Sequence, residues 1–325
     1  MSSLNRSLWQ DQAGVPGVIR ESPIPCNIAD NEILVKVHAW AMNPADAMVQ
    51  DVPLPFIKYP LILGEDVAGT VESAGSAAKA KFQPGDRVLG LALAWRAKFP
   101  TPCLSLKHLS FPSASRRRAH GLFSKDYLAL PFPTTNTPAN RTGKSIFIWG
   151  GSSGVGSNAI QLSKAAGFEV FTTCSARNFE YVKDLGADHV YDYNDPDVIS
   201  KVVAELDKGE CIGVLQAAGD VSPSCQVAHQ SKQNLRVAAT NPVSEWVAPD
   251  GVDAKMIFAS GGGVIYHETT PATFAGYLPD TLAKGVYKVA PPPEVVPTKG
   301  LEGIQEALNL LKKGVSAKKL VTLAN

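Results

Sequence analysis

A glycine-rich turn carries the clearest chemical signal in this chain of 325 residues. It reads Gly-Gly-Ser-Ser-Gly-Val-Gly at 150–156, after an apolar stretch at 145–149 and before the periodic apolar residues of 157–166. Glycines let a backbone approach a pyrophosphate closely, and a following helix supplies free N–H groups and a positive dipole end. The spacing is not a strict G-x-G-x-x-G, so the prediction depends on the position between strand and helix. The residues expected at the pyrophosphate are Gly150, Gly151, Ser152, Ser153, Gly154, Val155 and Gly156.

The end of the next strand indicates which dinucleotide is bound. Folds that prefer NAD carry an acid there, about 20 residues after the glycine fingerprint, to bind the ribose 2′-hydroxyl. Residues 172–178 read Thr-Thr-Cys-Ser-Ala-Arg-Asn, and the first acid is Glu180. Hydroxyl and guanidinium donors suit a 2′-phosphate, which an acid would repel. The sequence therefore favours NADPH; the alternative is that Arg177 and Asn178 only begin a solvated helix.

The same turn has two other interpretations. Residues 150–154 satisfy G-x-S-x-G, the nucleophile elbow of α/β-hydrolases, with Ser152 as the nucleophile and an acid and His229 or His267 downstream. Such an elbow normally follows several strands of its sheet, whereas the upstream half of this chain has the pattern of a separate β domain. The remaining interpretation is a tight turn that packs a helix on a sheet and binds no ligand.

Strand and helix patterns alternate around the turn. Glycines at 167 and 186 follow two of the expected helices, in the position of C-caps. Alternation with short connections predicts an α/β fold with a parallel sheet covered on both faces. The expected strands are 145–149, 168–172, 189–191, 212–216, 235–238 and 256–259, and the expected helices are 157–166, 178–185, one after Pro196, and 224–231.

The first 90 residues have a different pattern. Short β segments such as 33–39 and 67–72 are separated by turns such as Gln-Pro-Gly-Asp at 83–86, and long helical periodicity is missing. This pattern predicts a compact β-rich domain. The tail has an amphipathic helix at 301–311 and a strand at 319–323, which could return to the sheet of the first domain.

Composition limits the class of protein. Lysine plus arginine is 31 and aspartate plus glutamate is 30, so the clustered basic excess of a nucleic-acid-binding protein is not expected. A hydrophobic fraction of 45% is ample for a packed core. No apolar run reaches the roughly 18 residues of a membrane span, and the N-terminus lacks the apolar core of a signal peptide. We expect a soluble, cytoplasmic protein without a nucleic-acid or membrane partner.

No metal site is expected either. The number of cysteines is odd, and no pair has C-x-x-C spacing, so free thiols in a reducing compartment are the simplest interpretation. The six histidines are scattered, without an H-E-x-x-H pair. The cysteines are at positions 26, 103, 174, 211 and 225.

Several motifs occur in a fixed order along the chain. They are Gly-Glu-Asp-Val-Ala-Gly-Thr-Val-Glu at 64–72, Pro-Gly-Asp-Arg-Val at 84–88, the turn at 150–156, Leu-Gly-Ala-Asp at 185–188 and Gly-Val-Ser-Ala-Lys-Lys-Leu-Val at 314–321. Together these motifs resemble those of the medium-chain dehydrogenase/reductase superfamily, and Asn-Pro-Ala-Asp at 43–46 also fits. The most similar branch is the zinc-independent quinone oxidoreductase and enoyl reductase group, in particular the fungal zinc-binding-oxidoreductase-like and trans-acting enoyl reductase type.

The resemblance implies a domain organisation and an activity. It implies a GroES-like catalytic domain at 1–125, completed by 289–325, and a Rossmann NADP-binding domain at 126–288. It also implies hydride transfer from NADPH to an enone, an enoyl thioester or a quinone, by a monomer or homodimer that acts on a small molecule.

The resemblance also implies site residues. Asn43 and Asp46 would lie at the reacting end as catalytic residues. Zinc-dependent relatives have a histidine at the position of Glu65 and a cysteine near 43–46, so the resemblance implies a zinc-independent enzyme. No proton donor is evident, because 47–58 contain no tyrosine and Tyr59 is expected to pack before Pro60. The residues at the positions of 2′-phosphate contacts are Ser175, Arg177, Asn178 and Tyr193.

Residues 91–120 depart from the family pattern. Residues 115–118 read Ser-Arg-Arg-Arg. Some of the codons that encode a family-like Ile-Ser-Thr-Ala-Ala can give this sequence in a shifted frame. We therefore hypothesise a frameshift, a retained intron or another gene-model error, which transcript sequencing would test. Two alternatives treat the segment as genuine: a catalytically impaired family member that only binds NADPH, and a basic docking loop at 116–118.

Overall fold

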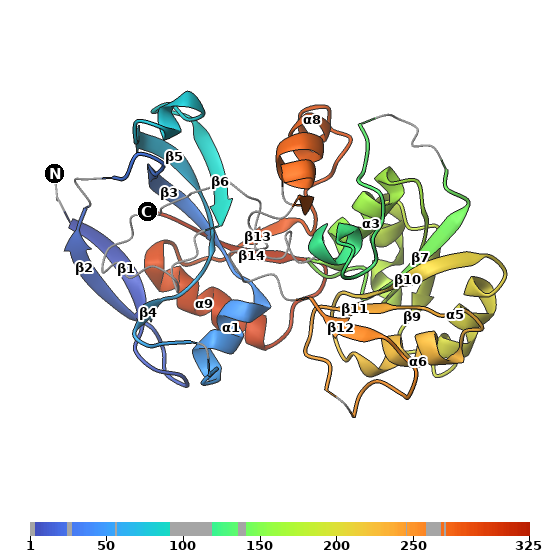
Figure 1. Cartoon of the computed structure of the whole chain (residues 1–325). Coiled ribbons are helices and arrows are strands. Elements are labelled where there is room, and N and C mark those ends of the chain that lie inside the picture. Colours follow the sequence, from blue (N-terminus) through green and yellow to red (C-terminus); the bar gives the residue numbers. More distant parts are fainter. Residues whose placement is uncertain are drawn as a thin grey trace. The chain divides into compact units, whose positions relative to one another are not determined.

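The computed structural model describes residues 4–24, 28–55, 57–91, 119–135, 141–244, 246–257, 268–269 and 271–325 (Figure 1). The predictions for Cys26, Cys103, His267 and most of 91–120, including the basic loop at 116–118, lie outside these residues. The chain forms two compact units. The first unit is Met1–Ser113 with Pro293–Val315 and Lys319–Asn325, and the second unit is Ala114–Pro292 with Ser316–Lys318.

The first unit is rich in β structure, as its sequence pattern predicts. Its larger sheet has the order β13 (Pro293–Val295), β14 (Lys319–Leu323), β3 (Ile33–Ala41), β5 (Asp66–Ala74) and β6 (Arg87–Leu91). A smaller sheet has the order β2 (Val18–Pro23), β1 (Leu4–Gln10) and β4 (Leu61–Ile62). The predicted return of the last strand is confirmed, because β14 pairs antiparallel with β3 and places Val321 opposite Ala41.

Two helices complete the first unit. Helix α1 (Pro44–Asp51) directly follows β3, and helix α9 (Gly300–Lys312) precedes β14. The apolar side of α9, at Leu301, Ile304 and Leu308, is buried in a cluster with residues of β1 and β4. This helical spacing is the periodicity that predicts the tail helix from the sequence.

The second unit contains the predicted parallel sheet. Its strand order is β12 (Ala254–Met256), β11 (Val237–Ala239), β10 (Glu210–Gln216), β7 (Lys144–Trp149), β8 (Glu169–Cys174) and β9 (His189–Asp192), with parallel pairing throughout. The connecting helices are α3 (Gly156–Ala165), α4 (Phe179–Asp184), α5 (Val198–Leu206) and α6 (Ser222–Gln230). The strand order reverses between β7 and β10, which is where such sheets bind their ligands.

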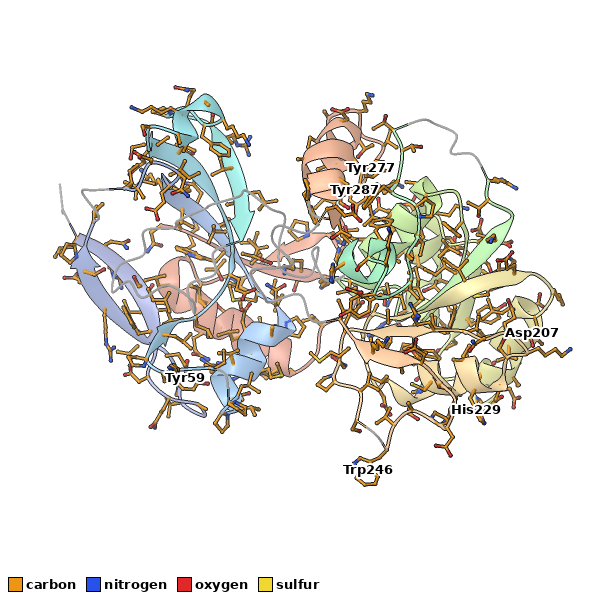
Figure 2. The ribbon with its side chains drawn as sticks, viewed as in Figure 1. Tyr59, Asp207, His229, Trp246, Tyr277 and Tyr287 are labelled. Carbon is orange, nitrogen blue, oxygen red and sulfur yellow. The ribbon has the colours of Figure 1, made fainter. Side chains whose placement is uncertain are left out.

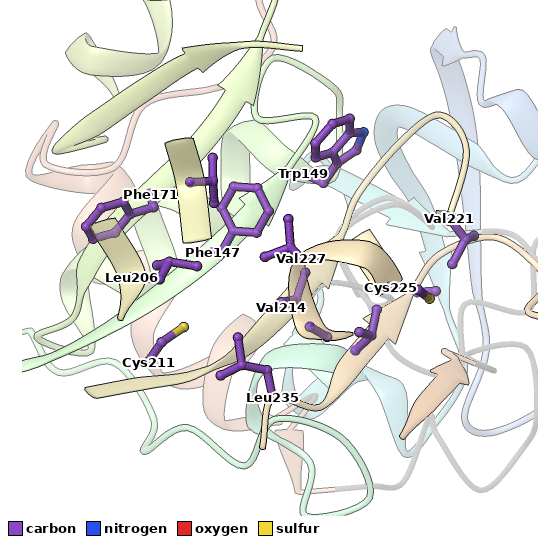
Figure 3. Packing of buried hydrophobic residues seen from close by; sticks show 14 of the residues in the cluster. Phe147, Trp149, Phe171, Leu206, Cys211, Val214, Val221, Cys225, Val227 and Leu235 are labelled. Carbon is purple, nitrogen blue, oxygen red and sulfur yellow. The ribbon is translucent and has the colours of Figure 1, made fainter. Parts of the chain in front are cut away.

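The core of this sheet is apolar on both faces because helices cover both. Figure 3 shows Phe147 and Val214 from the central strands packed near Val227 of α6 and Leu206 of α5. The described cysteines, Cys174, Cys211 and Cys225, are free and buried. Burial, with a smaller contribution from the charge of Asp192, raises the pKa of the Cys174 thiol to about 12.

Two short helical segments that no sequence pattern predicts follow the sheet. They are η4 (Pro271–Tyr277) and α8 (Leu278–Ala283). Both bury aromatic and aliphatic side chains, including Phe274, Tyr277 and Leu278. Across the part of the chain that the structure describes, none of the helices is both long and apolar enough to cross a membrane.

Candidate functional site

The glycine turn lies at the carboxyl end of β7, beside the reversal of strand order. Gly150 has a φ of +86°, a conformation that suits glycine. Its N–H donates to Thr173 Oγ1 at 3.1 Å, and the N–H of Gly151 donates to the Thr173 carbonyl at 2.8 Å. A Cβ atom on Gly156 would lie 2.3 Å from the Gly150 carbonyl oxygen. The turn can therefore close tightly onto α3 only with glycine at these positions.

One face of this turn is open. A Cβ atom on Gly154 would meet nothing closer than Pro291 Cδ at 4.0 Å. The N–H groups of Ser152 and Val155, both half-buried, have no acceptor among the described residues. Unbonded N–H groups at the start of a helix, next to open space, are the groups that bind a diphosphate. The turn therefore fits the pyrophosphate of a dinucleotide.

The polar residues predicted at the 2′-phosphate come together at the carboxyl ends of β8 and β9. The side-chain amide of Asn178 donates to Ser175 Oγ at 3.0 Å. Arg177 is exposed, and its side chain forms no ion pair or hydrogen bond with the described residues. Tyr193 is 45% exposed, and its N–H donates to the Cys174 carbonyl at 3.4 Å, which joins the two strand ends.

Two further residues near the carboxyl ends of β8 and β9 were not predicted from the sequence. Ser316 Oγ accepts a hydrogen bond of 2.8 Å from the Asn178 amide, 138 residues earlier in the chain. Asp192, the last residue of β9, pairs in register with Cys174 and accepts from the N–H and amide of Asn194. The parallel arrangement of strands could have revealed Asp192, because parallel strands end at the same edge. No local pattern indicates Ser316.

Asn43 and Asp46 belong to a buried polar cluster of the first unit, completed by Asp66 and Lys319. Asn43 is the N-cap of α1, and its N–H donates to Asp46 Oδ2 at 2.7 Å. Its amide donates to Asp66 Oδ2 at 2.8 Å, and its Oδ1 accepts from Lys319 Nζ at 2.5 Å. Lys319 Nζ also bonds Asp66 Oδ2 at 3.1 Å. Asn43 and Asp46 are 3% and 4% exposed, so the cluster holds both in place.

The electrostatics of this polar cluster are set by burial. Desolvation raises the pKa of Asp46 to about 7, with smaller increases from the charges of Glu65 and Asp66 and an opposing effect of Lys319. The Lys319 ammonium faces the Asp66 carboxylate, whose side chain is only 1% exposed. Zinc in proteins prefers thiolate and imidazole ligands. The polar cluster, with an amide, carboxyl groups and an ammonium, does not have that donor set.

Tyr59 packs as the sequence predicts. It lies against the apolar cluster that contains Leu61 and Leu63, and its hydroxyl donates to the Val49 carbonyl at 2.5 Å (Figure 2). Its hydroxyl is therefore engaged by the backbone of α1.

Ser152 lies at the carboxyl ends of the parallel strands, whereas His229 lies toward their amino ends. Ser152 follows the carboxyl end of β7, whereas His229 is exposed in the last turn of α6 (Figure 2). Helix α6 begins after β10 and runs back along the sheet for nine residues, about 13 Å. No hydrogen bond joins the Ser152 hydroxyl to a histidine among the described residues.

Comparisons with known proteins agree with this fold. Residues 29–128 match the family "Alcohol dehydrogenase GroES-like domain", and residues 154–238 match "Zinc-binding dehydrogenase". Dehydrogenase azaJ of Aspergillus niger is 40% identical and is matched over 94% of this chain and 96% of its own length. Trans-enoyl reductase himH of Aspergillus japonicus is 33% identical over 98% of this chain and 97% of its own.

Solved structures share the fold. A quinone oxidoreductase from Coxiella burnetii has a TM-score of 0.69 at 22% identity and covers 99% of this chain and 100% of its own. The CurK enoyl reductase has a TM-score of 0.68 at 18% identity and covers both chains completely. The molecule is thus an α/β protein with a GroES-like and a Rossmann fold. It belongs to the medium-chain dehydrogenase/reductase superfamily and is an oxidoreductase of that family.

Proposed function

We propose that this chain reduces an activated carbon–carbon double bond of an enone or enoyl thioester, or a quinone, by hydride transfer from NADPH and without zinc. The proposal rests on the groups that lie at the carboxyl ends of the parallel strands. There an open glycine turn offers free N–H groups, and Arg177 offers an exposed cation beside hydroxyl groups. Relatives named trans-enoyl reductase support the reaction class, and a mycobacterial neighbour solved with NADPH supports the cofactor.

In this proposal the residues of the chain bind the cofactor and orient it. The N–H groups of Ser152 and Val155 bind the diphosphate, and Arg177, with Ser175 and Tyr193, binds the 2′-phosphate. When bound, NADPH supplies the hydride.

We place Asn43 and Asp46 at the reacting end. Because the Asn43 amide already bonds Asp66 and Lys319, Asn43 acts there by positioning its neighbours. The Lys319 side chain, 21% exposed against 1% for that of Asp66, is the member of this ion pair that reaches solvent.

Two observations support the zinc-independent part of the proposal. Glu65 stands where zinc-dependent relatives have a histidine, and the Lys319 ammonium already balances the Asp66 carboxylate. We expect turnover to persist after exhaustive treatment with a zinc chelator. Loss of turnover with the chelator, and its recovery on adding zinc, would contradict this part.

The proposal is tested by fluorescence titration of the purified chain with NADPH and, in parallel, NADH. Turnover is then followed by the loss of NADPH absorbance with a panel of enones, enoyl thioesters and quinones. We expect tighter binding of NADPH and turnover with part of the panel. Binding without turnover would favour the catalytically impaired alternative that the departure at 91–120 suggests. A folded protein that binds neither dinucleotide would refute the proposal.

One variant distinguishes the hydrolase alternative from the proposed reductase. Ser152→Ala removes the nucleophile of the G-x-S-x-G motif but keeps the N–H group of residue 152. We expect the variant to retain NADPH binding and reductase turnover. Ester hydrolysis by the wild-type chain that disappears in the variant would support the alternative instead.

A further inference from the structure

Three adjacent strands of the larger sheet meet at the buried polar cluster of the first unit. Ala41, the last residue of β3, is paired with Val321 of β14 on one side and with Asp66, the first residue of β5, on the other. The antiparallel register with β14 places Lys319, the first residue of that strand, beside Asn43. The side chains of Lys319, Asn43 and Asp66 are therefore held together by the pairing of the strands.

Two of the three protons of the Lys319 ammonium fix its position. One is donated to Asn43 Oδ1 at 2.5 Å and another to Asp66 Oδ2 at 3.1 Å. The third proton has no acceptor among the described residues, and the Lys319 side chain is 21% exposed. Lys319 is therefore an oriented acid with one proton available to a bound molecule.

The other groups of this region that carry a polar proton are less available. Asp46 is 4% exposed, and its carboxyl group accepts the Asn43 N–H. Asn43 is itself 3% exposed. The hydroxyl of Tyr59 donates its proton to a backbone carbonyl of α1. Among these side chains, Lys319 is the one whose proton can reach a substrate.

We propose that Lys319 is the proton donor of the reduction and protonates the α carbon of an enone or enoyl thioester. The inference rests on the proposed function, because reduction of a carbon–carbon double bond needs a proton as well as a hydride. Hydride addition at the β carbon moves the π electrons onto the carbonyl oxygen and leaves an enolate. The Lys319 N–H bond then breaks as the α C–H bond forms. The neutral amine takes a proton from water, which restores the ion pair with Asp66.

Quinones separate this role from a structural one. Reduction of a quinone places its protons on oxygen, which water can supply directly. Protonation of an enolate carbon is slower, and a positioned general acid accelerates such a transfer by about 10²–10⁴-fold. A proton donor is therefore needed for enones much more than for quinones, whereas a structural residue is needed equally for both.

The test measures enone turnover, quinone turnover and NADPH binding for the wild type, Lys319→Arg and Lys319→Ala. Arginine keeps the positive charge and donors for Asn43 and Asp66, but its guanidinium does not release a proton in proteins. We expect both variants to lose about 100-fold in enone turnover and to change quinone turnover and the NADPH dissociation constant by less than about threefold. Methylammonium in the buffer should restore part of the enone turnover of Lys319→Ala.

Lys312→Ala is the matched control. Lys312 Nζ also bonds an amide oxygen and a carboxylate, those of Gln50 at 2.7 Å and Asp51 at 2.6 Å, and its side chain is 29% exposed. We expect this variant to reduce enones and quinones in the same ratio as the wild type, and methylammonium to have no effect on it.

Several results would overturn the inference while the proposed function stands. They are a wild type that reduces quinones but no enone, a folded Lys319→Arg or Lys319→Ala variant of unchanged enone turnover, and equal losses for enones and quinones. If the wild type reduces enones only, a loss in Lys319→Ala that methylammonium does not restore would overturn it. If Lys319→Ala does not fold, the ratio of enone to quinone turnover in Lys319→Arg decides. A wild type that reduces neither substrate would refute the proposed function itself.

Discussion

Asp46 shows how a single residue serves both a helix and a charge cluster. Its carboxyl group accepts the Asn43 N–H and so caps the start of α1, yet it is almost completely buried. Capping favours a carboxylate at this position, whereas burial favours the neutral acid. Burial prevails, because the pKa of Asp46 rises to about 7. At neutral pH the protonated and ionised forms of Asp46 are therefore populated to similar extents.

This balance predicts a pH dependence of stability. The folded pKa of Asp46 lies above its unfolded value of 3.8, so its contribution is complete below that value and is lost as pH rises through about 7. We expect the wild type to lose up to about 4 kcal/mol of unfolding free energy from this group between pH 4 and pH 8. Asp46→Asn, which keeps an acceptor for the Asn43 N–H, should remove that loss.

Urea unfolding at several pH values measures the difference between wild type and variant. Asp51→Asn serves as the control, because Asp51 is an exposed acid of the same helix paired with Lys312 at 2.6 Å. If the unfolding free energies of the wild type and of Asp46→Asn change in parallel with pH, burial does not raise the pKa of this carboxyl group.

At the scale of elements, the strand–turn–helix at 144–165 combines tight packing with an open face. A Cβ atom on Gly156 would meet the turn's own backbone, while a Cβ atom on Gly154 would meet only Pro291 Cδ among the described residues, at 4.0 Å. The tight packing at Gly156 is required by the fold, whereas the open face at Gly154 is required by the ligand. The two glycines can therefore be separated by experiment.

Alanine substitutions should separate these two roles. Gly156→Ala places a Cβ atom 2.3 Å from the Gly150 oxygen, so we expect a loss of about 2 kcal/mol or more in unfolding free energy. Gly154→Ala places its Cβ atom no closer than 4.0 Å to any described atom, an ordinary contact with Pro291 Cδ, so stability should change by less than about 0.5 kcal/mol. Its methyl group should still weaken NADPH binding by roughly tenfold, because the backbone can no longer approach the pyrophosphate as closely.

Thermal unfolding and NADPH titration of both variants provide the measurements. A Gly154→Ala variant that binds NADPH like the wild type would place the pyrophosphate elsewhere. A Gly156→Ala variant of undiminished stability would contradict the packing of the turn.

At the scale of the whole molecule, the chain divides into two compact units, and the proposed nucleotide contacts lie in the second. A ligand stabilises the unit that binds it, by about 2.7 kcal/mol at a concentration one hundred times its dissociation constant. Chains with more than one unit need not unfold in one step. Ligand binding should therefore distinguish the two units.

Differential scanning calorimetry should show two unfolding transitions. We expect saturating NADPH to raise the transition of the second unit by roughly 5–10 °C and to affect the other less. NADH at the same concentration should produce a smaller shift. A single transition that moves as a whole would contradict independent unfolding of the units.

The parts of the fold that the sequence predicts are those with strong local periodicity. Helix α9 and strand β7 follow from their apolar spacing, and the turn at 150–156 follows from its glycines. Segments η4 and α8 were missed because they are short and carry prolines at positions 271 and 279. Such short segments are stabilised mainly by tertiary packing, here of Phe274, Tyr277 and Leu278.

The sequence by itself determined the class of protein, the order of its strands and helices, and the turn and strand end proposed for the dinucleotide. Only the tertiary structure brought Ser316 to Asn178 and Lys319 to Asn43 and Asp66. It also decided the protonation of Asp46, because burial sets that pKa. The contacts of Lys319 arise from the pairing of β14 with β3, which brings the last strand of the chain beside the strand that precedes Asn43. Local spacing specifies an element, but contacts across hundreds of residues exist only after the chain has folded.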